Sequence, residues 1–291
     1  MKKDYVIFTD STTDLPYEEA KRLELEVLPL TFHIDDKSYK NELDYREMSA
    51  KDFFDAIRNG AKPTTSQLNS EDYTERVIPY LEKGIDVLIL SFSSALSGSF
   101  NSGRLAVQEL SDRYPERKIE IIDTKSASLG EGMLVYLAAE ERLAGKSMAD
   151  VIDFVNQTIP QVAHWFTVTD IKHLRRGGRI SMVKSILAQA LNIKPIMNCN
   201  VEGRLVPKDK VRTRRRSIEA IFQKMKETAL PKQEIVFISH GDDIESAEQL
   251  ASLVKAKFNP KKLLIHSIGP VIGAHTGQGV LALFYLATTR E

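Results

Sequence analysis

The sequence predicts an α/β protein of two domains, and three observations lead to this prediction. Short runs of β-branched residues alternate with amphipathic segments, as strands alternate with helices in α/β proteins. One run, Val87-Leu88-Ile89-Leu90, has no polar alternation, which is typical of a parallel strand covered on both faces. The sequence pattern changes after Pro160, where an expected strand is followed by a basic, glycine-containing stretch. We therefore expect a parallel-sheet, three-layer domain over residues 1–159 and a smaller domain, with a mixed sheet and helices, over residues 160–291.

The elements expected in the first domain follow this alternation. Gly60 and Gly145 each follow an amphipathic run, where a glycine in the left-handed conformation commonly ends a helix. The segment 62–67 is expected to be a loop between two helices, explained by turn chemistry or by a ligand. The expected strands are 5–9, 26–32, 86–92 and 119–122, and the expected helices are 49–59, 70–83, 98–113 and 132–144.

The second domain begins with an expected strand at 164–168, followed by a basic, glycine-containing stretch at 172–179. A helix near 182–191, extended pieces at 194–197 and 204–207, and a long helix at 214–228 come next. Strands at 234–239 and 262–268 complete two further strand-helix units.

Composition excludes several classes of protein. The 291 residues carry 40 Lys plus Arg and 40 Asp plus Glu, so no global charge favours a nucleic-acid partner. The one cysteine, Cys199, cannot form an intrachain disulfide, which fits a reducing compartment. The apolar run 280–287 is far shorter than the roughly 20 residues that cross a bilayer. We expect a soluble cytoplasmic protein with no membrane span.

Polar segments follow three of the expected strands, at the carboxyl ends where open α/β sheets bind ligands. They are 9–15, 91–101 and 269–279. The first two are rich in hydroxyl residues, which either cap a helix or bind a ligand at a helix N-terminus. The third surrounds His275 with four glycines and a proline, which predicts a tight loop where an imidazole approaches a ligand or has only a structural role.

Several common chemistries are not indicated. The chain has neither a Walker lysine loop nor a dinucleotide-binding glycine fingerprint. Ala95 stands where the nucleophile elbow of a serine hydrolase has glycine before Ser97. The six histidines and Cys199 do not show metal-ligand spacing, so we expect neither a metal nor a cofactor.

Five segments stand out across nearly the whole chain. They are Asp10-Ser11-Thr12-Thr13-Asp14-Leu15, Thr64-Thr65-Ser66-Gln67, Leu96-Ser97-Gly98-Ser99-Phe100-Asn101-Ser102, and the stretches 174–180 and 269–279. Together, and in this order, these segments resemble the DegV family. Three departures are Leu68, where members often have proline, Ser99-Phe100, where Thr-Tyr is common, and Gln278, where proline is common.

The resemblance implies a protein that holds one long-chain fatty acid in a tunnel between its two domains. The carboxylate ligands would be Thr65, Ser97 and His275, with Thr64 and Ser94 as additional candidates. A separate ATP-dependent fatty acid kinase would phosphorylate the bound acid, so the chain would have no complete active site of its own. Arg179 and Arg212 resemble the arginines that serve the encounter with the kinase.

The physical chemistry of a fatty acid agrees with this interpretation. Its tail dominates the affinity, whereas its buried carboxylate needs hydrogen-bond donors. Hydroxyls and an imidazole would leave the carboxylate more reactive than a bound arginine would, so we expect the arginines outside the carboxylate site.

Two other functions remain open at this point. One is a serine or phosphoryl hydrolase that uses Ser97 and His275, and the other is a carrier of a different amphiphilic lipid. The basic cluster 212–216 is a solvated face, a partner surface or, without interleaved aromatic residues, a weak candidate for nucleic acid, which we do not expect as a partner.

Overall fold

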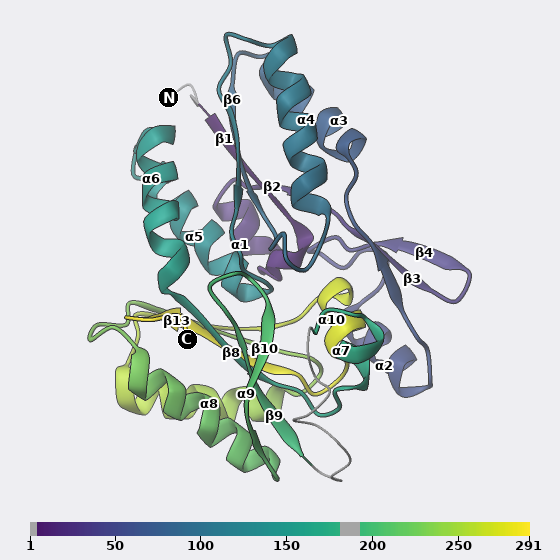
Figure 1. Ribbon diagram of the computed structural model, residues 1–291, viewed down its shortest axis with the longest axis vertical. Helices are drawn as coiled ribbons and strands as arrows, with labels where there is room; N and C mark the ends of the chain where they lie inside the picture. The colour runs from purple at the N-terminus through teal and green to yellow at the C-terminus, as the bar shows by residue number, and fades with distance from the viewer. Residues whose placement is uncertain (1–4, 181–192) are drawn as a thin grey trace.

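The computed structural model describes residues 5–180 and 193–291, and its first half is built on a parallel sheet (Figure 1). The strand order is β2-β1-β6-β7, with all neighbours parallel. The central strand β6 is buried through Val87-Leu88-Ile89-Leu90, which explains its lack of polar alternation. These strands are β1 (Tyr5–Asp10), β2 (Glu26–Leu28), β6 (Asp86–Ser91) and β7 (Ile119–Asp123).

Helices cover both faces of this sheet. Figure 1 shows α3 and α4 on one face and α5 and α6 on the other, which gives three layers. Asn69 and Ser147 cap α3 and α6, each with an aspartate three residues later in a capping box. The helices of this half are α1 (Tyr17–Arg22), α2 (Ala50–Arg58), α3 (Ser70–Leu81), α4 (Ser99–Arg113), α5 (Leu129–Leu143) and α6 (Met148–Thr158), and a short 3-10 turn, η1 (Ser11–Thr13), follows β1.

The second half is built on a mixed sheet of order β10-β9-β8-β13-β11-β12. Among the strands of the described residues, β11 and β12 pair in parallel, and the other neighbours in this sheet are antiparallel. The helices α8 (Arg214–Thr228) and α9 (Ile244–Phe258) pack on one face, where Trp165 and Leu283 point. The strands are β8 (Val162–Thr167), β9 (Lys194–Cys199), β10 (Leu205–Val211), β11 (Ile235–His240), β12 (Lys262–Ser267) and β13 (Leu281–Leu286), and a 3-10 turn, η2 (Ile159–Gln161), precedes β8.

The opposite face of the mixed sheet turns toward the parallel sheet. There α5 contacts β8, β11 and β13, and Phe166, Phe237 and Phe284 join the same apolar core as the parallel sheet. Two short helices, α7 (Lys172–Arg176) and α10 (Pro270–Thr276), pack on each other beside this face. A third sheet, β3 (Thr31–Ile34), β4 (Lys37–Lys40) and β5 (Thr64–Ser66), is antiparallel and extends to one side (Figure 1).

The two-domain α/β class is confirmed, and so are most expected elements. Gly60 and Gly145 do adopt positive φ after α2 and α5. The expected strand 26–32 is wrong as one strand, because residues 29–30 interrupt it and Pro29 has no amide hydrogen for a ladder. Segments 62–67 and 269–279 are not only loops, since they contain β5 and α10. The expected helix 182–191 lies outside the described residues.

The boundary between residues 159 and 160 stays a prediction. It coincides with η2, just before the first strand of the mixed sheet. Over the described parts of the chain, no helix is both long and apolar enough to cross a membrane.

Candidate ligand site between the two sheets

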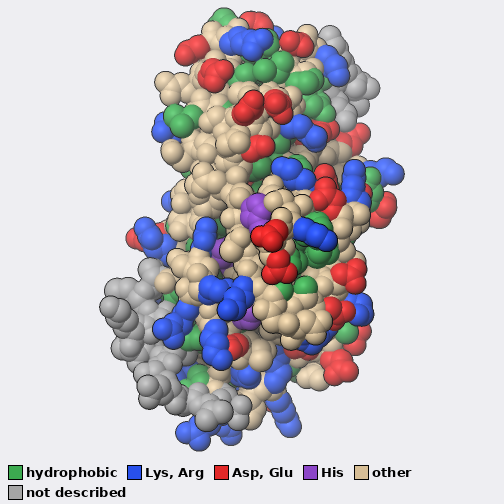
Figure 2. Space-filling view, turned by 90° about the vertical axis from the view of Figure 1, so that its right-hand side faces the viewer, with side chains coloured by type: hydrophobic (Ala, Val, Ile, Leu, Met, Phe, Trp, Pro, Cys, Tyr) green, Lys and Arg blue, Asp and Glu red, His purple; other side chains and the backbone are tan. Residues whose placement is uncertain are grey.

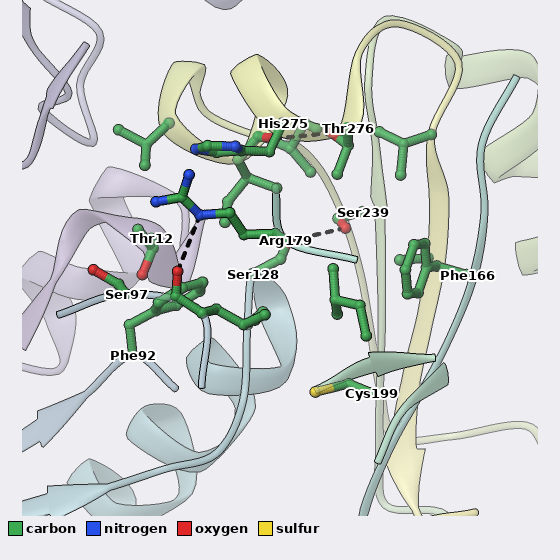
Figure 3. A pocket seen from close by; sticks show the side chains of 18 of the residues that line it. Thr12, Phe92, Ser97, Ser128, Phe166, Arg179, Cys199, Ser239, His275 and Thr276 are labelled. Atoms are coloured by element: carbon green, nitrogen blue, oxygen red, sulfur yellow. Dashed lines mark hydrogen bonds between the residues drawn. The ribbon is translucent and has the colours of Figure 1, made fainter. Parts of the chain in front are cut away.

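A cavity of about 380 Å³ lies between the carboxyl ends of the parallel strands and the inner face of the mixed sheet. Its size falls in the range of roughly 300–1,000 Å³ that small-molecule sites occupy. Figure 3 shows Thr12, Ser97, Arg179 and His275 toward one end and Phe166 and Cys199 toward the other, with Ser128 and Ser239 between them. The apolar part includes Leu30, Phe92, Leu96, Phe166, Leu174, Leu205, Ile268, Val271, Val280, Ala282 and Phe284. The cavity is therefore amphipathic.

Thr65 and His275 form a hydrogen-bonded pair on the cavity wall. Thr65 lies in β5 and His275 near the end of α10, and Thr65 Oγ1 is 2.9 Å from His275 Nε2. The antiparallel pairing of β5 with β3 places Thr65 opposite Phe32, next to α10. Burial lowers the pKa of His275 to about 4, helped by the positive charges of Arg179 and Arg176. The imidazole is therefore neutral at pH 7.

Ser97 lies in the turn between β6 and α4. Its Oγ is 2.9 Å from Ser99 Oγ and accepts a hydrogen bond from the Ser99 amide at 3.2 Å. Ser99 Oγ in turn accepts from the Leu68 amide at 3.2 Å, so the two polar segments fix each other. Leu68 can make this bond because it has the amide hydrogen that proline lacks. Ser99 is a supporting residue that the sequence pattern did not indicate as a partner of Ser97.

Arg179 lies on the wall of the same cavity, closer to the other candidates than expected. Its Nε donates to Leu96 O at 3.1 Å and its Nη1 to Gly177 O at 2.5 Å. Figure 3 shows the guanidinium in the region of His275 and Ser97. Two backbone carbonyls thus hold the side chain, and its role toward ligand or partner stays a prediction.

The structure does not bring the other candidates to the cavity wall. Ser94 is exposed, and its hydroxyl donates to Asp123 Oδ2 at 2.5 Å. Thr64 is exposed on β5, where it pairs with His33 of β3. Arg212 is exposed between β10 and α8.

The segment after β1 has a structural role and also borders the cavity. Asp10 accepts hydrogen bonds from the backbone amides of Thr12 at 3.0 Å and Phe92 at 3.2 Å, so it caps η1 and ties β1 to the end of β6. Thr12 lines the cavity and donates to Glu131 Oε2 at 2.8 Å. Capping was one of the two interpretations of this segment.

Two serines on the wall were missed. Ser128 Oγ donates to Asp14 Oδ2 at 2.6 Å and lies 3.2 Å from Ser239 Oγ. Ser239 ends an expected strand, and that position was the available signal for it. Ser128 precedes a helix, and no local pattern indicated its place on the wall. Among residues 5–180 and 193–291, no group of three or more His, Cys, Asp or Glu is placed to hold a metal ion.

Comparison with known proteins points to one family. A model described as "Uncharacterised protein, DegV family" matches residues 4–288. A DegV domain-containing protein of Clostridium perfringens is 41% identical over 99% of both chains. Another, from Streptococcus pyogenes, is 35% identical over 97% of this chain and 98% of its own.

Solved structures agree with these sequence matches. A fatty-acid-binding DegV family protein from Thermus thermophilus has a TM-score of 0.87 and 29% identity, covering 98% of this chain and 99% of its own. A DegV lipid binding protein from Thermotoga maritima has a TM-score of 0.86 and 26% identity, covering 99% and 100%. The Fatty Acid Kinase B3 protein of Streptococcus pneumoniae, loaded with linoleic acid, shares the fold at 18% identity and a TM-score of 0.83, covering 97% and 99%. The sequence described here is a member of the DegV family.

Proposed function

We propose that this protein binds one long-chain fatty acid in the cavity between its sheets and presents the carboxylate to a separate ATP-dependent fatty acid kinase. The observation that carries the proposal is the amphipathic cavity, with Thr65, Ser97 and His275 on its wall. The fatty-acid-binding relative from Thermus thermophilus supports it, because the likeness extends over 98% of this chain.

The apolar part of the cavity suits an alkyl tail. Each methylene removed from water contributes about 0.8 kcal/mol, so a tail of about 16 carbons gives on the order of 10 kcal/mol before ordering costs. The tail therefore supplies most of the affinity, and the polar end selects the head group.

The polar end suits a carboxylate held by neutral donors. A buried carboxylate that loses water needs replacement hydrogen bonds, and hydroxyls donate them without adding charge. Ser97 and Thr65 each have one hydroxyl hydrogen to give, and neutral His275 supports Thr65 at 2.9 Å. In this arrangement the carboxylate keeps its negative charge and can attack the γ-phosphate of ATP.

The surface beside the cavity suits an acidic partner. Lys172, Arg175, Arg176 and Arg179 all lie in or just after α7, where their charged ends reach the surface. Figure 2 shows Lys and Arg side chains gathered on this face of the lower half of the molecule. Arg179 and Arg212 are the residues we assign to the kinase encounter.

The rival function, a hydrolase with a Ser97-His275 pair, has less support. Activation of a serine requires its hydroxyl within hydrogen-bond reach of the base. In this structure Ser97 Oγ is hydrogen-bonded to Ser99 and His275 Nε2 is hydrogen-bonded to Thr65, so the two groups are not hydrogen-bonded to each other.

Ser97→Ala and His275→Ala should each weaken fatty-acid retention by roughly 1–3 kcal/mol, since a carboxylate oxygen or Thr65 loses its partner. Native mass spectrometry of the purified protein measures the co-purified lipid and its loss. Ser94→Ala is the matched control, because Ser94 is an exposed serine bonded to Asp123. Turnover of ester or phosphoester substrates that Ser97→Ala abolishes would instead favour the hydrolase.

Arg179→Ala should retain the lipid but impair acyl phosphate formation by a cognate kinase. The physical reason is that Arg179 is already held by two backbone carbonyls, whereas Ser97 and Thr65, the latter supported by His275, are the carboxylate donors in our proposal. Lipid content and kinase-dependent ATP consumption are measured on the same preparation. Loss of lipid from this variant would place the arginine on the carboxylate and overturn the division of roles.

A further inference from the structure

Two glycine-histidine contacts join α7 and α10 reciprocally. Gly177 ends α7, and a Cβ atom at this position would lie closer than 3.0 Å to His275 Nδ1 on α10. Gly277 ends α10, and a Cβ there would lie closer than 3.0 Å to the ring of His173 on α7. Real Cβ atoms essentially never approach other atoms so closely. Each helix therefore ends in a glycine, and the histidine ring of the other helix packs directly against that glycine.

The contact at Gly177 bears on how His275 is protonated. His275 Nδ1 is buried with no hydrogen-bond partner among the described residues, whereas Nε2 lies 2.9 Å from Thr65 Oγ1. A buried N–H without an acceptor is rarer and costlier than an unused acceptor. The neutral ring therefore carries its hydrogen on Nε2, which donates to Thr65. Because that bond uses a lone pair of Thr65, the Thr65 hydroxyl hydrogen is free to point into the cavity.

We infer that Gly177 is a positioning residue for the fatty-acid site: it holds His275 so that the imidazole donates to Thr65 and Thr65 donates to the carboxylate. This inference rests on the proposed function and adds a residue that contacts no ligand itself. Gly177 O also accepts from Arg179 Nη1 at 2.5 Å. The backbone that fixes the His275 ring thus also fixes the arginine that we assign to the kinase encounter.

The first test reads the tautomer of His275 in the unsubstituted protein. Long-range proton-nitrogen NMR correlation spectra of nitrogen-labelled protein distinguish the two neutral tautomers of a histidine, and His275→Gln identifies the signal. We expect the hydrogen on Nε2 at pH 7, with or without fatty acid. A hydrogen on Nδ1 would overturn the inference, whether or not the protein binds lipid.

The second test is a double-mutant cycle. Gly177→Ala should displace the ring and weaken fatty-acid retention by about 5- to 150-fold, the range expected when a buried hydrogen bond loses a partner. In a His275→Ala background, where the ring is absent, the same substitution should change retention less than about twofold, as sites that act through one contact are not additive. An equal loss in both backgrounds would show that Gly177 does not act through His275.

Gly178→Asn is the matched control for this cycle. Gly178 is the next residue, its φ is +68° and a Cβ there would have nothing within 4 Å. Asparagine tolerates the left-handed conformation, so this variant should keep both the retention and the His275 tautomer of the unsubstituted protein. If the unsubstituted protein holds no fatty acid, the proposed function fails, while the NMR signal still shows which nitrogen of His275 carries the hydrogen.

Discussion

At the scale of single residues, the most unusual groups near the cavity are three buried carboxyls, Asp10, Asp14 and Glu131. Desolvation raises the pKa of all three carboxyls. The hydrogen bonds that they accept lower the pKa, but by less. Asp14 accepts from the Gly269 amide at 2.8 Å and from the Ser128 hydroxyl at 2.6 Å, and its pKa is raised to about 8. Asp14 thus joins the start of α10 to the start of α5 while it is largely protonated at neutral pH.

This protonation predicts how stability depends on pH. Between the ordinary aspartate pKa of 3.8 and about 8, the folded state keeps a proton on Asp14 that the unfolded state has lost. The stabilisation from protonated Asp14 is therefore fully present below the unfolded-state pKa of 3.8. It is lost as the pH rises through the folded-state pKa of about 8, by at most about 1.4 kcal/mol per pH unit. Asp14→Asn, whose amide oxygen accepts from the Gly269 amide and whose NH₂ donates to Ser128 Oγ in place of the bond that Asp14 accepts, should reduce the fall in stability between pH 5 and pH 8.

Urea unfolding at the two pH values measures this effect. Asp153→Asn, which removes an exposed carboxylate on α6, is the control and should leave the pH dependence unchanged. Asp10 and Glu131 still contribute in the Asp14 variant, so the dependence should shrink and not vanish. The same slope in Asp14→Asn and in the unsubstituted protein would mean that Asp14 is ionised in the folded state.

Residue positions that the sequence could predict are those at strand ends. Ser97 and His275 follow strands in the sequence, so the pattern of strands and polar residues was enough to propose their segments as sites. Ser128 could not be proposed in this way, because its place on the wall depends on how α5 packs between the two sheets. Likewise, the position of Arg179 on the wall depends on two backbone carbonyls that no local pattern specifies.

At the scale of elements, hydrophobic pattern and capping residues predicted the long helices well. The helix expected at 214–228 matches α8, which Thr213 caps by accepting from the Arg216 amide. Short elements were missed because tertiary contacts create them. Strand β5 has three residues, too few for a periodic pattern, and forms because β3 offers it a hydrogen-bonding edge.

Tertiary contacts also explain why α10 is a helix where the sequence predicted a loop. Glycine density in 269–279 predicted a tight loop, since glycine disfavours helix interiors. In the structure, Gly273 lies inside the helix because a Cβ there would be closer than 3.0 Å to the ring of Phe53. Close packing of helix against aromatic ring thus outweighs intrinsic propensity, and it places His275 beside β5.

At the scale of the whole molecule, the cavity exists because two sheets meet through one core. Arg290 fastens the two halves at the far end of the chain: it is buried, and its guanidinium donates to Cys199 O at 3.1 Å and Ile159 O at 3.2 Å and also to Lys125 O. With both halves fixed in this way, the width of the cavity is set by the side chains of the inner sheet face. We therefore expect the side chains on the inner sheet face to determine the length of the acyl chain that fits.

Ala282→Phe tests this prediction. Ala282 lies in β13 on the cavity wall, between Ser239 of β11 and Phe166 of β8. A phenyl ring there would occupy space meant for the tail, and if it excludes about four methylenes, binding should weaken by roughly 3 kcal/mol. Calorimetric titration of delipidated protein with hexadecanoate and decanoate measures the ratio of the two affinities, which should move toward the shorter acid.

Leu283→Phe supplies the matched control for that ratio. Leu283 is the next residue of β13, and its side chain points to the other face, against α8 and α9. Overpacking there should lower the melting temperature but leave the ratio of affinities unchanged, because no cavity volume is lost. An unchanged ratio in Ala282→Phe as well would mean that the tail does not pass this strand, and the bound acid would then have to extend from the polar end in another direction.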